Sequence, residues 1–221
     1  MKRWLALMSF VCGLPLSAAG AQSPESQRTV TANVIVSASS PRLRIELPKQ
    51  ARYLGADRWL LYDIADCEAH VFVEADAHKV VRRLYWVQFE GYVPGRPDLK
   101  YDYGSDPVRR IHGIDFHVRT RSGPTDEPAR AGSDTEHVRQ LMHAAGYAMP
   151  PDMMNVRLVH LLDATERSEL MIIYAESASV AGIAGPDLVS GGKGSERWLA
   201  VDPAIVQRAA KRIAFHEFTE K

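Results

Sequence analysis

The chain has 221 residues, with 27 lysines and arginines against 27 aspartates and glutamates, and only two cysteines. This balance excludes the strongly basic surface that is typical of nucleic-acid binding. The length suits one sizeable domain with its own core rather than a chain of small modules.

The first residues have the layout of a secretory signal peptide. Met1, Lys2 and Arg3 precede the apolar run "WLALMSFVCGLPL" and the small-residue segment "SAAGAQS". Cleavage after Ala21 is predicted, which assigns 1–21 to the signal peptide and 22–221 to one soluble exported domain, periplasmic or extracellular. The apolar run is shorter than the roughly 20 residues of a membrane span, and no later segment approaches that length. Cys67 would then be the only cysteine of the mature chain, which excludes an intramolecular disulfide.

The first half of the mature chain is rich in predicted strands. Segments 29–38 and 42–47 have β-branched content and are expected to pair. Segment 58–75 alternates with an apolar set on its odd positions, and 81–93 returns after a polar turn, which predicts a long antiparallel hairpin. A further strand is predicted over 111–120, and 121–133 is predicted to be an exposed loop because it is rich in Gly, Pro, Ser and charge.

The second half contains both predicted helices. Ser133 and Glu136 fit a capping box, and apolar residues recur at helical spacing over about 134–146. Segments 153–162 and 169–177 predict a second hairpin, followed by an exposed Gly- and Ser-rich loop over about 177–196 and a short strand over 197–201. Asp202 and Pro203 suit the start of a helix over about 203–217. The pattern predicts an α+β fold with a mostly antiparallel, curved sheet of long hairpins, packed by these two helices.

Several chemistries lack their sequence signature. The segment "SGGKGS" at 190–195 does not have the glycine and hydroxyl positions of a phosphate-binding P-loop. No serine nucleophile elbow is present, and Cys67 has no catalytic signature around it. The eight histidines are not spaced as convergent ligands, so we predict no metal and no cofactor.

Two ionisable residues share strand positions with apolar neighbours. Asp63 lies between Leu61 and Ala65, and His160 lies between Leu158 and Leu162. Because an unpaired buried charge is costly, two inward-facing groups of this kind would be candidates for acid–base catalysis. The alternative is a β-bulge that turns Asp63 outward and a histidine that serves only the core.

The other candidate site is a polar sheet face on the first long hairpin. The core is expected to contain Tyr85, Val87 and Phe89, so the even-numbered residues between them would lie on the opposite face. There they would lie beside Glu68 and His70 of the preceding strand. A row of aromatic, amide and carboxyl groups is typical of a cleft for a small polar molecule. The predicted ligand-binding residues are Trp86, Gln88, Glu90, Tyr92, Glu68 and His70.

Three functions remain compatible with these patterns. The leading hypothesis is an exported protein that binds a small-molecule ligand or a cell-envelope protein through a sheet face without catalysis. The second is a hydrolase or isomerase that uses Asp63, Glu90 and His160 as acid and base groups. The third is a structural or interaction module of the envelope that makes contact through the loop at about 177–196.

Overall fold

The computed structural model describes residues 28–182 and 195–218. Two antiparallel sheets and two α-helices make up this part of the chain, which confirms the predicted α+β class with a mostly antiparallel architecture. The predicted signal peptide and most of the predicted Gly- and Ser-rich loop lie outside the described residues. Within the described residues, no helix is long and apolar enough to cross a membrane.

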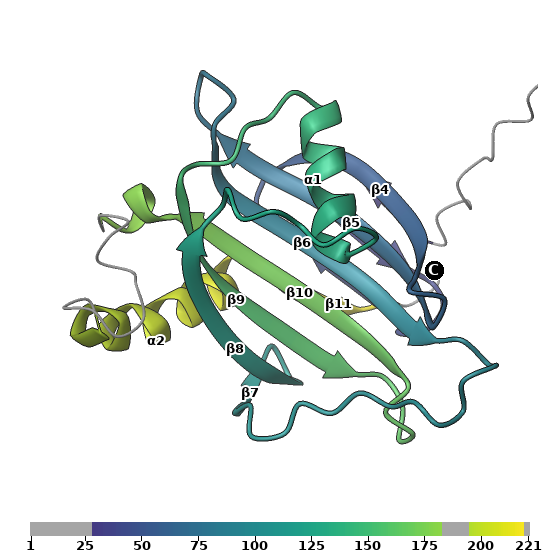
Figure 1. The fold of residues 1–221 in the computed structure, drawn as a ribbon. Helices are drawn as coiled ribbons and strands as arrows, with labels where there is room; N and C mark the ends of the chain where they lie inside the picture. Colours follow the sequence, from purple (N-terminus) through teal and green to yellow (C-terminus); the bar gives the residue numbers. More distant parts are fainter. Residues whose placement is uncertain (1–27, 183–194, 219–221) are drawn as a thin grey trace, which may run out of the picture.

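The larger sheet has seven strands in the order β4-β5-β6-β10-β9-β8-β7. Its strands run over long, twisted hairpins and pair antiparallel throughout (Figure 1). Their bounds are β4 Arg52–Leu61, β5 Ala65–Ala75, β6 Val81–Tyr92, β7 Val108–Ile111, β8 Ile114–Pro124, β9 Asp152–Leu161 and β10 Ser168–Ser177.

The smaller sheet has four strands in the order β1-β2-β3-β11. It joins the N-terminal strands to the last strand of the chain, because β11 pairs with β3 from Ala214↔Glu46 to Glu217↔Leu43. Its strands are β1 Thr29–Thr31, β2 Val34–Ser37, β3 Leu43–Glu46 and β11 Ala214–Glu217.

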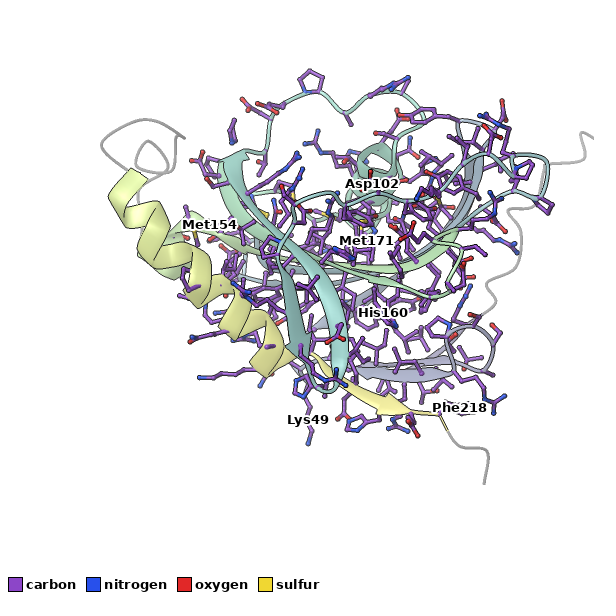
Figure 2. All side chains as sticks on the ribbon, turned by 90° about the horizontal axis from the view of Figure 1, so that it is seen from below. Lys49, Asp102, Met154, His160, Met171 and Phe218 are labelled. Atoms are coloured by element: carbon purple, nitrogen blue, oxygen red, sulfur yellow. The ribbon has the colours of Figure 1, made fainter. Side chains whose placement is uncertain are left out.

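The two helices cover opposite faces of the larger sheet (Figure 1). Helix α1 (Asp134–Ala144) packs Val138 and Met142 on one face, against a core that includes Trp86 and Val159. Helix α2 (Ser195–Arg212) and the smaller sheet share the other face, whose core includes Ile205. In Figure 2, Asp102 and Met171 lie on the α1 side and His160 and Phe218 on the other. Both faces of the sheet are therefore buried, and polar side chains on either face must find partners inside the protein.

Helix α1 begins where the sequence predicts it. The Ser133 side chain accepts a hydrogen bond from the Glu136 backbone N–H, and the Glu136 carboxylate accepts one from the Gly132 backbone N–H at 2.6 Å. The chain turns away after Ala145, at Gly146 with φ 75°, a conformation that glycine adopts without steric cost.

The C-terminal prediction was wrong in its bounds. Helix α2 begins at Ser195, so Pro203 lies inside it and the strand predicted over 197–201 is helical. Trp198, Val201 and Ile205 recur at helical spacing across the proline, which explains the earlier start. The helix ends at Arg212 because the next residues pair with β3 as β11, so the predicted helix over 203–217 is cut short by strand pairing.

The loop predicted over 121–133 is shorter than expected. Strand β8 continues to Pro124 and pairs with β9 as far as Pro124↔Asp152, so the loop predicted over 121–133 starts only after it. A 3-10 turn, η1 (Ala178–Ala181), follows β10, and α2 begins at Ser195.

Candidate functional site

Asp63 and His160 do not form a site together. Segment 58–75 is two strands rather than one, because the chain reverses between β4 and β5 at Tyr62 and Asp63, both of which have positive φ. Asp63 is consequently exposed in a hairpin turn, which is neither the predicted inward position nor a bulge. His160 is half-buried on β9, with its Nδ1 3.0 Å from the Asp115 carbonyl oxygen. Strands β5, β6 and β10 separate the two residues, so the acid–base pair predicted from them is wrong.

The six predicted ligand-binding residues lie on two faces of the sheet. Trp86 opposes Val71, whereas His70 opposes Val87 and Glu68 opposes Phe89. The reason is a register shift between Glu74 and Ala75, where a bulge displaces the ladder by one residue and exchanges the faces. Trp86, Gln88, Glu90 and Tyr92 therefore face α1, and Glu68 and His70 face the smaller sheet.

On the α1 face, Trp86, Gln88 and Glu90 of β6 form a hydrogen-bonded row. The Trp86 indole donates to the Gln88 side-chain oxygen at 2.9 Å, and the Gln88 amide donates to Glu90 at 2.7 Å. The Tyr101 hydroxyl donates to the other Glu90 oxygen at 2.8 Å, from the loop that follows β6. Gln88 is fully buried, so this face is a second core layer and not the solvent-facing surface that the alternation suggested.

Three carboxyl groups meet on this face, and we call Glu90, Asp134 and Glu169 the carboxyl cluster. Glu169 of β10 directly opposes Glu90 of β6, and the Tyr103 hydroxyl donates a hydrogen bond to it. Like charges placed directly opposite each other on neighbouring strands destabilise a sheet when both are ionised. Asp134 opens α1 above them.

The pKa values of the carboxyl cluster reflect this crowding. Burial raises the pKa of Glu169 to about 8, with further contributions from the charges of Glu90 and Asp134. Burial, and then the charge of Asp134, raises the pKa of Glu90. Burial also raises the pKa of Asp134, against the opposing effect of the Gln88 amide and the Trp59 indole. The cluster favours bound protons or a bound cation.

On the opposite face, Glu68 and His70 form a buried relay. The Glu68 carboxylate accepts from the Arg28 guanidinium at 3.0 Å, and its other oxygen lies 3.0 Å from the His70 Nε2. The His70 Nδ1 lies 3.2 Å from the Tyr53 hydroxyl. The Arg28 guanidinium also lies 4.1 Å from the centre of the Phe89 ring, close enough for a cation–π interaction.

A pocket of about 330 Å³ adjoins this relay, and we call it the inter-sheet pocket. The register places most of its wall on the face that packs against the smaller sheet, and the segments around β1 and between β2 and β3 contribute Arg28 and Ser40. Glu90 and Tyr92 also line it, although their side chains belong to the other face. The lining residues are Arg28, Ser40, Arg58, Asp66, Glu68, Phe89, Glu90, Gly91, Tyr92, Val93, Pro94, Leu162 and Ser168.

The walls of the inter-sheet pocket carry two ion pairs. Arg28 pairs with Glu68, and the Arg58 Nε donates to Asp66 at 2.9 Å. Gly91 opposes Ser168 across β6 and β10, and the missing side chain at Gly91 leaves this part of the wall open. Phe89 and Leu162 supply apolar surface, so the pocket offers charge, hydroxyl groups and apolar contact together.

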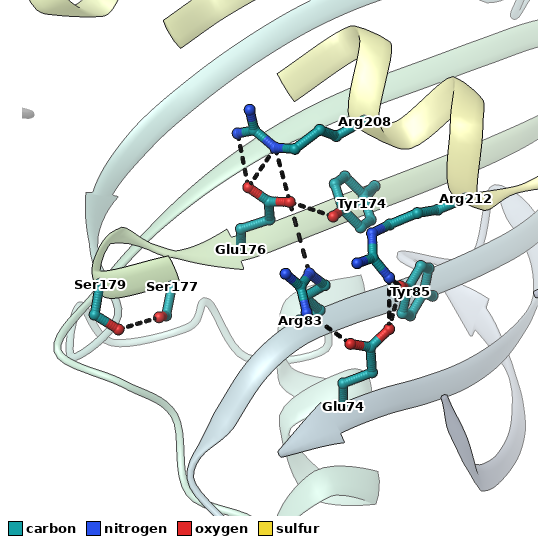
Figure 3. A network of polar contacts seen from close by, with 9 residues as sticks. All are labelled: Glu74, Arg83, Tyr85, Tyr174, Glu176, Ser177, Ser179, Arg208 and Arg212. Carbon is teal, nitrogen blue, oxygen red and sulfur yellow. Dashed lines mark hydrogen bonds and ion pairs between the residues drawn. The ribbon is translucent and has the colours of Figure 1, made fainter. Parts of the chain in front are cut away.

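A third polar network ties α2 to the sheet (Figure 3). We call it the α2 network, and it comprises two buried carboxylates with their arginine and tyrosine partners. Glu176, which is 1% exposed, accepts from the Arg208 Nε at 3.0 and 2.9 Å and from the Tyr174 hydroxyl. The second carboxylate, that of Glu74, accepts hydrogen bonds from Arg83, Tyr85 and Arg212 at 2.7 to 2.9 Å. Its charges pair internally, which indicates an anchor for the helix rather than a site.

Sequence reasoning missed the residues that complete both sites. Asp134 and Glu169 join the α1 face, and Arg28, Gly91 and Ser168 join the pocket. The alternation of Glu169 with Met171 and Ile173 places it on a single face of its strand, but its position opposite Glu90 depends on a pairing between segments about 80 residues apart.

One set of groups could hold a metal ion. Cys67, Glu90 and Asp134 each offer one donor atom, and these three atoms lie within 4.8 Å of one another. No known protein family, curated protein or solved structure matches this chain.

Proposed function

We propose that the protein is an exported binding protein whose inter-sheet pocket holds a small polar molecule without transforming it. The pocket is the observation that supports this proposal. Its volume of about 330 Å³ is at the lower end of ligand sites, which span roughly 300–1,000 Å³. The lining includes three of the predicted ligand-binding residues, Glu68, Glu90 and Tyr92. The His70 Nε2 lies 3.0 Å from the Glu68 carboxylate.

The charge pattern favours a ligand that carries both donor and acceptor groups. Arg28 and Glu68 neutralise each other, as do Arg58 and Asp66, and Glu90 is the remaining ionisable acidic group of the lining. A small zwitterion could exchange partners with both pairs while its apolar part contacts Phe89 and Leu162. Because these charged groups are held in pairs, the wall suits orientation of a ligand rather than proton transfer.

The test is native mass spectrometry of the protein purified from its own compartment, followed by calorimetric titration with free amino acids as probes. We expect a co-purified small molecule and saturable binding of at least one amino acid. The intact mass of the same preparation shows whether the leader is removed after Ala21. Export is supported by the leader sequence alone.

Gly91→Val is the decisive variant, because its methyl groups would project into the pocket. A Cβ at this position would meet the Ser168 hydroxyl oxygen at 3.4 Å, a contact that the serine can relieve by rotation. We expect at least a tenfold loss of affinity with an unchanged fold. Gly123→Val is the matched control, since a Cβ at Gly123 meets nothing within 4 Å and lies on β8, away from the pocket. Equal binding by both variants would contradict the proposal.

A further inference from the structure

The donor atoms of Cys67, Glu90 and Asp134 converge beneath the first turn of α1. Cys67 of β5 directly opposes Glu90 of β6, and Asp134 is the first residue of the helix that packs over these strands. Their donor atoms lie within 4.8 Å of one another. Three separate elements thus fix the positions of the three groups, and the site lies on the face opposite the inter-sheet pocket.

A second observation at this place points to a missing ligand. Trp59 of β4 directly opposes Cys67 and is only 8% exposed; its indole acts electrostatically on the Asp134 carboxyl, yet its Nε1 has no partner in hydrogen-bond geometry among the described residues. The Asp134 Oδ1 is buried and also lacks a partner within the described part of the chain. Buried polar atoms are nearly always paired, so an unpaired donor beside an unpaired acceptor needs an explanation. A water molecule held on a bound ion could accept from the indole and donate to the carboxylate.

The charge of the site supports a cation. Among the described residues, no lysine, arginine or histidine forms an ion pair within 4.0 Å of Glu90, Asp134 or Glu169. A divalent ion would offset two negative charges at their centre.

The donor set selects the kind of ion. One thiolate with two carboxylates suits an ion of borderline softness, because Ca²⁺ and Mg²⁺ bind oxygen ligands only. At Zn–S and Zn–O lengths of roughly 2.3 and 2.0–2.2 Å, tetrahedral ligand atoms lie roughly 3.3–3.7 Å apart. The donor atoms, which lie within 4.8 Å of one another, would therefore need to approach by no more than about 1.5 Å.

We propose that Cys67, Glu90 and Asp134 bind one divalent transition-metal ion of the Zn²⁺ type, with a water molecule between the ion, Trp59 and Asp134. This site goes beyond the proposed function: it shares Glu90 with the lining of the inter-sheet pocket, but Cys67 and Asp134 do not line that pocket. It also replaces the expectation from sequence that the chain binds no metal, which considered histidine spacing and not a cysteine with two carboxyls.

The test uses the full chain, stripped with a chelator and then titrated with Co²⁺ and Zn²⁺. We expect one equivalent of Co²⁺ with a thiolate charge-transfer band in the near ultraviolet, and one equivalent of Zn²⁺ by native mass spectrometry. Cys67→Ser should abolish the band, and Asp134→Asn, which keeps the side-chain shape, should weaken Zn²⁺ binding at least tenfold. Thermal unfolding of each variant checks that the fold persists.

A matched control separates this site from other binding. Glu136→Gln removes a carboxylate from the same helical turn without touching the site, because Glu136 accepts from the Gly132 N–H instead. The proposal is overturned if no thiolate band forms, or if Cys67→Ser and Asp134→Asn bind Zn²⁺ as tightly as the unaltered chain.

Discussion

Removal of the Glu176 carboxylate should cost more stability than removal of any exposed charge. The carboxylate is 1% exposed and accepts from the Arg208 guanidinium and the Tyr174 hydroxyl, with the Arg83 Nε at 3.7 Å. In Glu176→Ala, the Arg208 guanidinium loses its counter-charge at the α2–sheet contact, whereas Arg83 keeps its ion pair with Glu74. Breaking a buried pair costs roughly 3–5 kcal/mol, and because the Arg208 side chain is 35% exposed we expect the lower end, about 3 kcal/mol.

The assay is urea unfolding at pH 7 followed by tryptophan fluorescence. Arg208→Ala should cost less than Glu176→Ala, because Arg83 and Tyr174 still contact the buried carboxylate. Glu46→Ala serves as the control, since Glu46 is exposed and its one ion-pair contact, with His216, is 3.9 Å long; we expect a change below about 0.5 kcal/mol. A loss below about 1 kcal/mol in Glu176→Ala would refute the view that this network anchors α2.

Two further predictions concern the loop after β6 and the carboxyl cluster. Arg167 donates to the carbonyl oxygens of Arg96, Leu99 and Val93 at 2.7, 2.6 and 3.0 Å. Arg167→Ala should therefore speed amide hydrogen exchange across 93–107. Unchanged exchange there would show that these hydrogen bonds do not hold the loop in place. Burial raises the pKa of Glu169 to about 8, so the folded state keeps a proton that the unfolded chain releases, and stability should fall as pH rises from about 4.5 to about 8. With chelator present, Glu169→Gln should reduce this pH-dependent loss in the free energy of unfolding by on the order of 2 kcal/mol. The full pKa shift would imply an upper limit of about 5 kcal/mol. Parallel pH profiles of stability for the two proteins would contradict the prediction.

Much of the fold follows from local patterns. Helix α1 can be predicted from the sequence because the Ser133 cap, the apolar spacing and Gly146 all indicate the same bounds. The hairpins around β6 and β10 are readable from alternation. The turn at Tyr62 and Asp63 is not, because tyrosine rarely adopts positive φ and no glycine or proline marks the reversal.

The candidate sites were predictable only in part. Alternation separates the two faces of β6 correctly, but a single bulge near Ala75 decides which face of β5 joins which face of β6. Nothing in the residues around it identifies that bulge in advance. The positions of Asp134 in the carboxyl cluster and of Arg28 in the pocket depend on how a helix and the N-terminal segment pack on the sheet. The residues next to them in the sequence do not specify this packing.

The order of the seven-stranded sheet has a consequence for assembly. Strands β4, β5 and β6 form one meander and β7 to β10 form another, and the strands of the two meanders pair along the β6–β10 seam from Ser168↔Gly91 to Glu176↔Arg83. Local hairpins form early, whereas pairing of distant segments waits for the entropy of closing a long loop. Gly91 opposite Ser168 and Glu90 opposite Glu169 both lie at one end of this seam. Neither the complete pocket wall nor the carboxyl cluster therefore exists until the two meanders have joined, so the pocket's ligand would be recognised only by a chain that has completed its folding.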